Sequence, residues 1–494
     1  AKFGIFGDGK EVAQVAMAKS FQNGDWRSGY YRDQTFLIAS GITDADEFFS
    51  QLYGDTDVEN NKGSGGRSFN NHYCSRTLNE DGTWKELTKM KNSAADLSPT
   101  AAQVPRLLGL AYASKLFRHN KDLKPFTHLS NQGNEVAFGT IGDASTSEGH
   151  FFEVMNAAGV LQVPLAIAVW DDGYGISVPK NLQTIKNSIS EVMKGFSKEN
   201  DSNGILIYKA KGWDYPGLCK MFADGITISR EKHIPVLFHV EDMVQPLGHS
   251  TSGSHERYKS TERLEWEKQH DPLVKMKEWM LESGIAEEKI IDQMHDKAFD
   301  EAKAARDRAW KKYRTPIMSE RDELLRIIGN KSCVCKNSGV DKISIIAKNL
   351  RQIKNPIRKD IISAAKKTIH HICLDCDQRN ELQVSLGRWL NKQKVDNYER
   401  YNNQVYNESE FSALNVEEIK PVYSDKSPEV YGREIIRDNF DYLFNEYPLL
   451  VTFGEDTGKL GDVNQGLEGI QEKYGELRIT DTGSKTINKG KSRW

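Results

Sequence analysis

The sequence lacks an excess of either charge. Its 67 lysines and arginines stand against 70 aspartates and glutamates, which leaves a formal net charge of −3 over 494 residues. Without a basic excess there is no general electrostatic reason to expect nucleic acid as a partner. The sequence also lacks a run of about 20 apolar residues, the length needed to cross a bilayer. We therefore expect neither nucleic-acid binding nor insertion into a membrane.

Cysteine is scarce, and the marks of secretion are missing. Six cysteines over this length do not make a disulfide framework of the kind that stabilises small secreted domains. The N-terminal stretch AKFGIFGDGKEV lacks the basic start and apolar middle of a signal peptide. We therefore expect a protein of the reducing cytoplasm. The length allows two or three domains with substantial cores.

Four of the six cysteines could bind a metal ion. Cys333 and Cys335 form a C-x-C pair, and Cys373 and Cys376 form a C-x-x-C pair. Together they could supply the tetrahedral thiolate ligands that zinc prefers. The second pair lies in a helical pattern, however, and reduced thiols on helices are the simpler interpretation. The sequence leaves both possibilities open.

Apolar runs alternate with helix-like stretches through the first half of the chain. Runs at residues 134–142, 164–170, 204–210 and 235–241 have the length of buried strands and are bounded by glycine, proline or charge. A helix is predicted over 147–162, between the first two runs. This alternation is typical of a parallel sheet with helices packed against it, so we predict an α/β fold.

Changes in composition predict the division of the whole chain. The first domain is expected over 1–330, where the α/β pattern passes into a charged, helical one. A helical segment at 331–395 follows, in which Pro356 is expected to kink the chain. A polar linker is expected at 396–427, and the α/β pattern restarts at 428–494.

Acidic residues follow two neighbouring predicted strands. Asp143 comes directly after Gly142, where a tight turn and the small Ala144 let backbone N–H groups approach an anion. Asp171 and Asp172 end the next strand. In an open parallel sheet, ligands bind beyond the carboxyl ends of the strands. Carboxylates beside an anion site suit Mg²⁺, which prefers oxygen ligands and keeps phosphate oxygens in its shell.

The spacing of this unit resembles the thiamine-diphosphate motif. Gly-Asp and a small residue are followed, beyond residue 170, by a polar pair and GYGIS. The resemblance implies thiamine diphosphate as the cofactor, and Mg²⁺ held by Asp143, the Asp172 side chain and the Tyr174 carbonyl. The family usually has two asparagines where this chain has Asp171 and Asp172, so each Asp keeps an oxygen and adds a negative charge. The alternative is an Asp pair that merely caps a turn.

More of the chain resembles the thiamine-dependent 2-oxo acid dehydrogenases, in particular their decarboxylating first component. SGYYRDQ at 28–34 is similar to the family's Tyr-Arg segment, and GHSTSGSHERYKS at 248–260 is similar to its His-Ser loop. The resemblance implies that His249 is catalytic. It also implies a set of cofactor-binding residues, namely Tyr31, Arg32, Ser98, Gly142, Asp143, Ala144, Asp172, Tyr174 and His249.

Residues 451–483 resemble the opening of the family's other chain, the β subunit. We therefore expect an α subunit fused to the start of a β subunit. At the position of the family's proton-relay glutamate this chain has Thr486, and residues 484–494 do not resemble the family. The alternative to an active enzyme is therefore a truncated cofactor-binding chain without catalytic competence.

The resemblance also implies a reaction and partners. The reaction is oxidative decarboxylation of a 2-oxo acid, with transfer of the acyl group to a lipoyl domain of an acyltransferase component. A branched-chain 2-oxo acid such as 2-oxoisovalerate is the first choice of substrate, pyruvate the second and acetoin the third. An oligomer of this chain, or an assembly with a β region, is expected because the family's cofactor lies between chains.

Overall fold

The structure is a computed structural model that describes residues 5–250, 255–329, 341–374, 379–402, 407 and 409–482. The chain divides into two units. The first comprises Ala1–Asp44, Ser68–Asp296 and Glu417–Trp494, and the second comprises Ala45–Arg67 and Lys297–Val416. The four-part division expected from composition stays a prediction.

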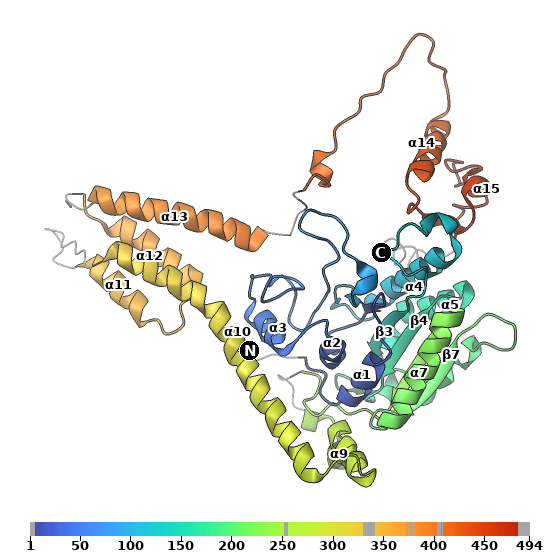
Figure 1. Cartoon of the computed structure of the whole chain (residues 1–494), viewed down its shortest axis with the longest axis horizontal. Coiled ribbons are helices and arrows are strands. Elements are labelled where there is room, and N and C mark those ends of the chain that lie inside the picture. Colours follow the sequence, from blue (N-terminus) through green and yellow to red (C-terminus); the bar gives the residue numbers. More distant parts are fainter. Residues whose placement is uncertain are drawn as a thin grey trace. The chain divides into compact units, whose positions relative to one another are not determined.

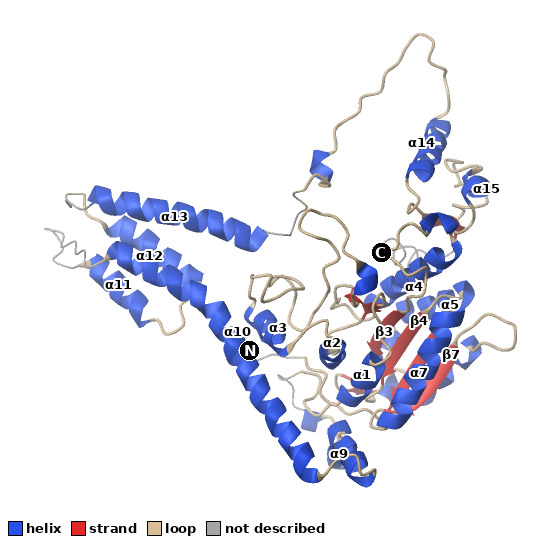
Figure 2. Ribbon diagram, in the orientation of Figure 1, coloured by secondary structure: helices blue, strands red, loops and turns tan. Residues whose placement is uncertain are grey.

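Among the residues that the structure describes, six parallel strands form one sheet in the first unit (Figure 2). The strands are β1 (Trp26–Ser28), β2 (Asn92–Ser93), β3 (Ala137–Gly142), β4 (Leu165–Trp170), β7 (Leu206–Lys211) and β8 (Val236–Glu241). They lie in the order β2-β1-β3-β4-β8-β7, and every neighbouring pair is parallel. The predicted α/β fold is confirmed, and the four predicted apolar runs coincide with β3, β4, β7 and β8.

Helices pack on both faces of this sheet (Figure 1). On one face lie α4 (Gln103–His119) and α5 (Gly149–Leu161), and on the other lie α1 (Glu11–Ala18) and α7 (Tyr215–Lys232). Helix α5 connects β3 to β4, and α7 connects β7 to β8. Parallel neighbours need such a crossover because the chain must return to the other end of the sheet. The unit is therefore a three-layered α/β/α structure.

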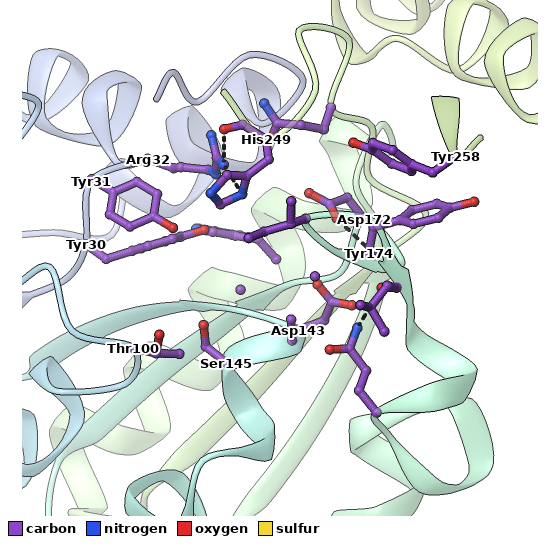
Figure 3. Close-up of a pocket in the computed structure, with 18 of the residues that line it drawn as sticks. Tyr30, Tyr31, Arg32, Thr100, Asp143, Ser145, Asp172, Tyr174, His249 and Tyr258 are labelled. Carbon is purple, nitrogen blue, oxygen red and sulfur yellow. Dashed lines mark hydrogen bonds between the residues drawn. The ribbon is translucent and has the colours of Figure 1, made fainter. Parts of the chain in front are cut away.

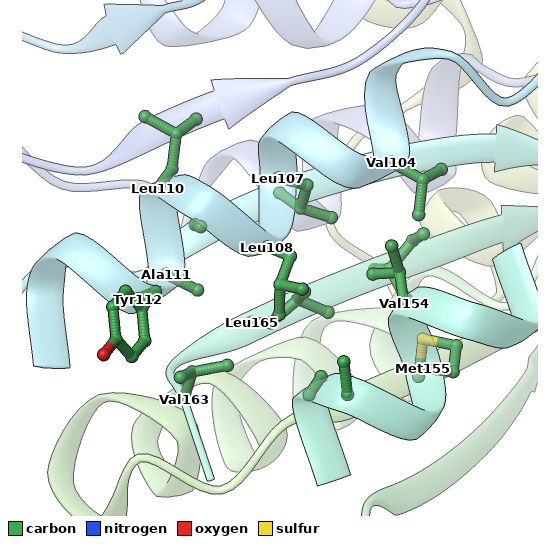
Figure 4. Close-up of a cluster of buried hydrophobic side chains, with 14 of the residues drawn as sticks. Val104, Leu107, Leu108, Leu110, Ala111, Tyr112, Val154, Met155, Val163 and Leu165 are labelled. Carbon is green, nitrogen blue, oxygen red and sulfur yellow. The ribbon is translucent and has the colours of Figure 1, made fainter. Parts of the chain in front are cut away.

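Strand β4 shows why the sequence has a continuous apolar run here. All of its residues are buried. Leu165, Ile167 and Val169 belong to the core under α4 and α5, part of which is drawn in Figure 4. Ala166 and Trp170 belong to the core on the opposite face. Because side chains alternate along a strand, a strand covered on both faces needs apolar residues at every position.

Short polar side chains mark the starts of two helices. The Asp214 carboxylate accepts the Gly217 N–H at 3.0 Å before α7. The Asp271 carboxylate accepts the Leu273 N–H at 2.8 Å before α9 (Pro272–Glu282). These bonds satisfy N–H groups that have no partner within the helix, so the local sequence sets where each helix begins.

The remaining elements of the first unit are short. The helices are α2 (Gln34–Ser40), α6 (Ile189–Val192), α8 (Thr261–Gln269), α14 (Gly432–Glu446) and α15 (Ile470–Tyr474). Strands β5 (Tyr174–Gly175) and β6 (Val178–Pro179) form an antiparallel hairpin, and β9 (Thr452–Gly454) and β10 (Ile479–Asp481) form a parallel pair. Beyond residue 428 the chain therefore contains both helices and strands.

The described part of the second unit is helical. Its helices are α3 (Ala45–Tyr53), α11 (Lys342–Gln352), α12 (Arg358–His371), α13 (Arg379–Asn402) and the later part of α10 (Glu288–Ile328). Pro356 lies between α11 and α12, so the chain breaks into two helices here, because proline disfavours a helical conformation in the residue before it. Helix α13 continues into the polar stretch assigned to the linker. None of the described helices is long and apolar enough to cross a membrane.

His233 makes the first unit sensitive to acid. It is buried at the end of α7, has a φ of 54°, and donates from Nε2 to the Gly133 carbonyl at 2.9 Å. Burial lowers the pKa of His233 from 6.5 to about 4. Between these two values the unfolded chain binds more protons than the folded one. The free energy of unfolding therefore decreases as the pH falls through this window.

We expect His233→Asn to remove this acid sensitivity, because asparagine tolerates a positive φ and does not titrate. Between about pH 7 and pH 5 the wild type should lose about 2 kcal/mol more stability than the variant. Urea unfolding followed by circular dichroism at both pH values measures the difference. His295→Asn, at an exposed position, serves as the control. Equal losses in wild type and His233→Asn would show that His233 is not the group responsible.

Candidate functional site

A buried ion network holds the turn that follows β1. Arg27 donates to Asp33 at 2.7 Å and lies 2.9 Å from Asp96, and all three side chains are at most 1% exposed. Arg27 also donates to the Tyr30 carbonyl at 3.2 Å, and the Thr140 hydroxyl on β3 donates to Asp33. Buried charges persist only where they are paired. The network therefore fixes the turn at residues 30–32 against the carboxyl end of the sheet.

The acidic residues lie at the same edge of the sheet. Asp143 donates its N–H to the Trp170 carbonyl at 3.2 Å, and Asp171 donates its N–H to the Val240 carbonyl at 3.0 Å. The parallel ladder thus extends to both acidic positions. Gly173 then turns the chain with a φ of 82°, a conformation that costs glycine little. The backbone alone places the carboxylates side by side.

A cavity of about 430 Å³ lies at this edge (Figure 3). It brings together most of the predicted cofactor-binding residues, namely Tyr31, Arg32, Gly142, Asp143, Ala144, Asp172, Tyr174 and His249. Ser98 is not among the described residues that line it. The Ser98 hydroxyl instead lies 2.8 Å from Nε2 of His72, and Thr100 from the same segment lines the cavity. A role of Ser98 in cofactor binding stays a prediction.

Other lining residues were not among those predicted to bind the cofactor. They are Tyr30, Ser145, Ile176, Val178, Gln183, Gln245, Tyr258 and Lys259, together with Trp170 and Gly175. Three of them, Tyr30, Ser145 and Gly175, are next to a predicted residue in the chain. Proximity to a recognised motif could therefore have indicated these neighbours, although not which side chains face the cavity.

The Asp143 carboxylate has an oxygen that the described protein does not satisfy. The residue is 5% exposed, and its Oδ2 has no hydrogen-bond partner among the described residues. Burial, followed by the charges of Asp172 and Asp171, raises the pKa of Asp143 well above 3.8. A buried carboxylate is costly unless a cation or a proton satisfies it. Asp143 therefore fits the role of a metal ligand.

Asp171, in contrast, is satisfied by the protein itself. Its Oδ2 accepts from Lys180 at 2.8 Å and from Nε2 of His239 at 2.9 Å, and its Oδ1 accepts the Gly173 N–H at 3.0 Å. Ser190 lies 2.9 Å from the other ring nitrogen of His239. Burial raises the pKa of Asp171, but these hydrogen bonds and charges outweigh it and leave the pKa below 3.8. Asp171 therefore fixes the loop.

Asp172 is paired with a lysine that the sequence analysis did not single out. The Nζ atom of Lys10 lies 3.0 Å from Oδ2 of Asp172 and also donates to the Gln245 side chain at 2.7 Å and the Val244 carbonyl at 3.1 Å. Lys10 is 1% exposed. Oδ1 of Asp172 accepts the Tyr174 N–H at 3.3 Å. Lys10 and Asp172 stand 162 positions apart, so no local spacing could have indicated their contact.

Arg32 contacts both the ring and the backbone carbonyl of His249 (Figure 3). Its Nη2 lies 3.1 Å from Nδ1 and 2.7 Å from the carbonyl oxygen of His249, and its Nη1 donates to the Phe6 carbonyl at 2.8 Å. Arginine can only donate, so Nδ1 accepts, and the proton of the neutral ring lies on Nε2. Burial, followed by the charge of Arg32, lowers the pKa of His249 below 6.5. His249 is therefore neutral at pH 7 and donates through Nε2.

Whether the cysteines bind zinc stays open. Cys333, Cys335 and Cys376 lie outside the described residues, as does Thr486. Within the described ranges, no group of three or more His, Cys, Asp or Glu side chains is placed to hold a metal ion. Three such side chains line the cavity, namely Asp143, Asp172 and His249, and the last is bound to Arg32. A third oxygen ligand beside the two carboxylates therefore has to come from another kind of group, such as a backbone carbonyl.

Comparisons with known proteins cover the part of the chain that contains this cavity. The chain is 26% identical over 313 residues to the 2-oxoisovalerate dehydrogenase subunit alpha of Bacillus subtilis. The aligned region covers 62% of this chain and 82% of the relative. It is 26% identical over 278 residues to the mitochondrial alpha subunit of Caenorhabditis elegans, covering 56% and 55%, respectively. For the human mitochondrial subunit the identity is 26% over 280 residues, covering 56% and 53%.

The chain thus spans about half the length of these two mitochondrial relatives. The sequence profile of one family, described as the Dehydrogenase E1 component, matches residues 1–317. That range contains the whole six-stranded sheet and every residue that lines the cavity. The chain belongs to the family of dehydrogenase E1 components.

Proposed function

We propose that the chain binds thiamine diphosphate with Mg²⁺ and acts as the decarboxylating first component of a 2-oxo acid dehydrogenase. The observation that carries the proposal is the cavity, which Tyr31 and Arg32 line together with Asp143 and Asp172. Guanidinium and hydroxyl donors suit a diphosphate, and carboxylate oxygens suit Mg²⁺. Membership of the E1 family supports the same assignment.

Five residues of the cavity have a defined role in this proposal. Asp143, the Asp172 side chain and the Tyr174 carbonyl would hold Mg²⁺, and Arg32 would bind the diphosphate. When bound, thiamine diphosphate supplies the electron sink for decarboxylation. His249 is neutral with a proton on Nε2, so it can donate a hydrogen bond, or that proton, to an oxygen of the substrate.

We propose a branched-chain 2-oxo acid such as 2-oxoisovalerate as the substrate, with pyruvate and acetoin as the alternatives. Ile176 and Val178, on the β5–β6 hairpin, line the cavity and are 61% and 43% exposed. Apolar groups at the rim of a polar cavity suit a substrate with an aliphatic side chain, because contact removes apolar surface from water. The names of the relatives support the same substrate class.

The proposal extends to partners and organisation. A lipoyl domain of an acyltransferase component would accept the acyl group, and the protein would act in the cytoplasm as an oligomer or together with a β region. Residues 428–482 would form the start of a β-subunit-like region. This last assignment is supported by α14, β9 and β10, which resume helices and strands after the linker.

Calorimetric titration tests the cofactor assignment. We expect thiamine diphosphate to bind the chain when Mg²⁺ is present and binding to be lost when EDTA removes the metal. Turnover is then assayed with 2-oxoisovalerate, pyruvate and acetoin and an artificial electron acceptor. Absence of Mg²⁺-dependent binding would refute the proposal. Binding without turnover would favour the alternative of a catalytically incompetent cofactor-binding chain, which Thr486 in place of the family's glutamate suggests.

A further inference from the structure

We propose that Lys10 is a positioning residue whose ammonium group makes Asp172 act as an uncharged oxygen ligand. The ion pair cancels the charge of the carboxylate, engages Oδ2 and leaves Oδ1 outside the pair. The inference rests on the proposed cofactor site, because it gives Asp172 its role there. It explains how this chain can have an aspartate where the family it resembles has an asparagine.

All the hydrogen-bonding capacity of Lys10 is used inside the protein. An ammonium group has three N–H donors, and three acceptors surround this one, namely Asp172 Oδ2 at 3.0 Å, Gln245 Oε1 at 2.7 Å and the Val244 carbonyl at 3.1 Å. No donor is left over for a phosphate oxygen. Lys10 therefore acts on the site through Asp172 and not by direct contact with a ligand.

The backbone just before Lys10 is held in place by close packing. Gly9 has a φ of 84°, and a Cβ atom built on it would lie 2.3 Å from the Val244 carbonyl oxygen. The Gly7 N–H donates to the Gln34 side chain at 2.8 Å. The segment that carries Lys10 thus packs directly on the loop after β8, with no space for a larger residue at position 9. The backbone from which the Lys10 side chain extends is therefore held against this loop.

Electrostatics explains why the site needs this partner. Asp143 is buried, and the carboxylates of Asp171 and Asp172 both oppose its ionisation. Lys180 already neutralises Asp171 at 2.8 Å. With Lys10 against Asp172, the net charge of the three carboxylates and two lysines is that of Asp143 alone. Without Lys10, a second uncompensated carboxylate would lie in a poorly hydrated site, where like charges repel strongly.

A double-mutant cycle tests the proposal in the whole chain. The variants are Lys10→Met, Asp172→Asn and the double variant, and the control is Lys211→Met, which breaks an exposed pair with Asp242. The Mg²⁺ concentration that gives half-maximal binding of thiamine diphosphate is measured by calorimetry at saturating cofactor. We expect Asp172→Asn to raise it about tenfold or more, because the ammonium group of Lys10 is then unpaired beside the metal. Lys10→Met alone should not raise it, because an unpaired carboxylate attracts the cation. The double variant should return it to within about threefold of wild type.

The outcomes separate a positioning role from a structural one. If Lys10 only stabilises the fold, Lys10→Met will lower the melting temperature but will not rescue Asp172→Asn, and this absence of rescue overturns the inference. If Lys10→Met alone fails to fold, the comparison of Asp172→Asn with the double variant decides. A wild type without Mg²⁺-dependent binding refutes the proposed function. If the wild type binds the cofactor but the double variant binds no better than Asp172→Asn, only the role of Lys10 is refuted.

Discussion

Asp143→Asn should stabilise the cofactor-free protein and at the same time abolish its Mg²⁺-dependent binding of thiamine diphosphate. The Asp143 side chain is buried, its Oδ2 has no partner among the described residues, and Asp172 and Asp171 add to the cost of its charge. A neutral amide of the same shape removes that cost, so the free energy of unfolding should rise by about 1 kcal/mol. Loss of the charge should weaken metal-dependent binding about 100-fold or more.

The neighbouring Asp171→Asn provides a matched comparison with the opposite effect on stability. It leaves Lys180 and His239 without their anionic partner, so the cofactor-free protein should lose about 3 kcal/mol. Urea unfolding without cofactor measures the free energy of unfolding of both variants. Calorimetry with Mg²⁺ measures their binding of thiamine diphosphate. Destabilisation by Asp143→Asn as large as that of Asp171→Asn would mean that the Asp143 carboxylate is satisfied in the free protein.

Arg32→Met should weaken cofactor binding and raise the pKa of His249 in the same protein. Arg32 donates to the ring and the carbonyl of His249, and its charge lowers the pKa of that ring after the larger effect of burial. Methionine keeps much of the side-chain volume but loses the charge and the donors. Loss of the charge-assisted hydrogen bonds to the diphosphate should weaken binding about 100-fold.

The pKa of His249 can be followed without cofactor by NMR titration of the histidine ring protons. The signal of His249 is identified by its absence in His249→Asn. In Arg32→Met we expect its pKa to rise towards 6.5 but to stay below that value, because burial remains. Lys180→Met, which removes a cation bound to Asp171, should leave the His249 titration unchanged. The same titration curve in wild type and Arg32→Met would rule out the contact between Arg32 and His249.

The central strands could be predicted from the sequence because both of their faces are covered. In β4 every residue is buried, which gives a continuous apolar run with clear ends. Strands β1 and β2 carried no such signal. They are three and two residues long, and their buried side chains include Arg27, Asn92 and Ser93, which are held by hydrogen bonds and an ion pair rather than by apolar contacts.

The site was predictable where its residues share a short motif. Asp143 and Asp172 follow consecutive strands of one crossover unit, so their spacing indicates a common edge. Such a resemblance indicates a segment more readily than a single side chain. Ser98 was the predicted contact, whereas Thr100, two positions further on, lines the cavity. The role of Lys10 could not be predicted from the sequence, for another reason. Its contact with Asp172 depends on how α1 packs on the sheet, and hydrophobic periodicity does not encode which polar atoms meet across that interface.

The two neighbouring aspartates acquire their partners over very different lengths of chain. Asp171 binds a lysine 9 positions away, whereas Asp172 binds one 162 positions away. The entropy lost on closing a loop grows with its length, and contacts distant in sequence slow folding. We therefore expect Asp171 to be anchored as soon as its own loop forms. Asp172 stays unpaired until the segment at residues 7–10 docks, so the acidic site is completed late in folding.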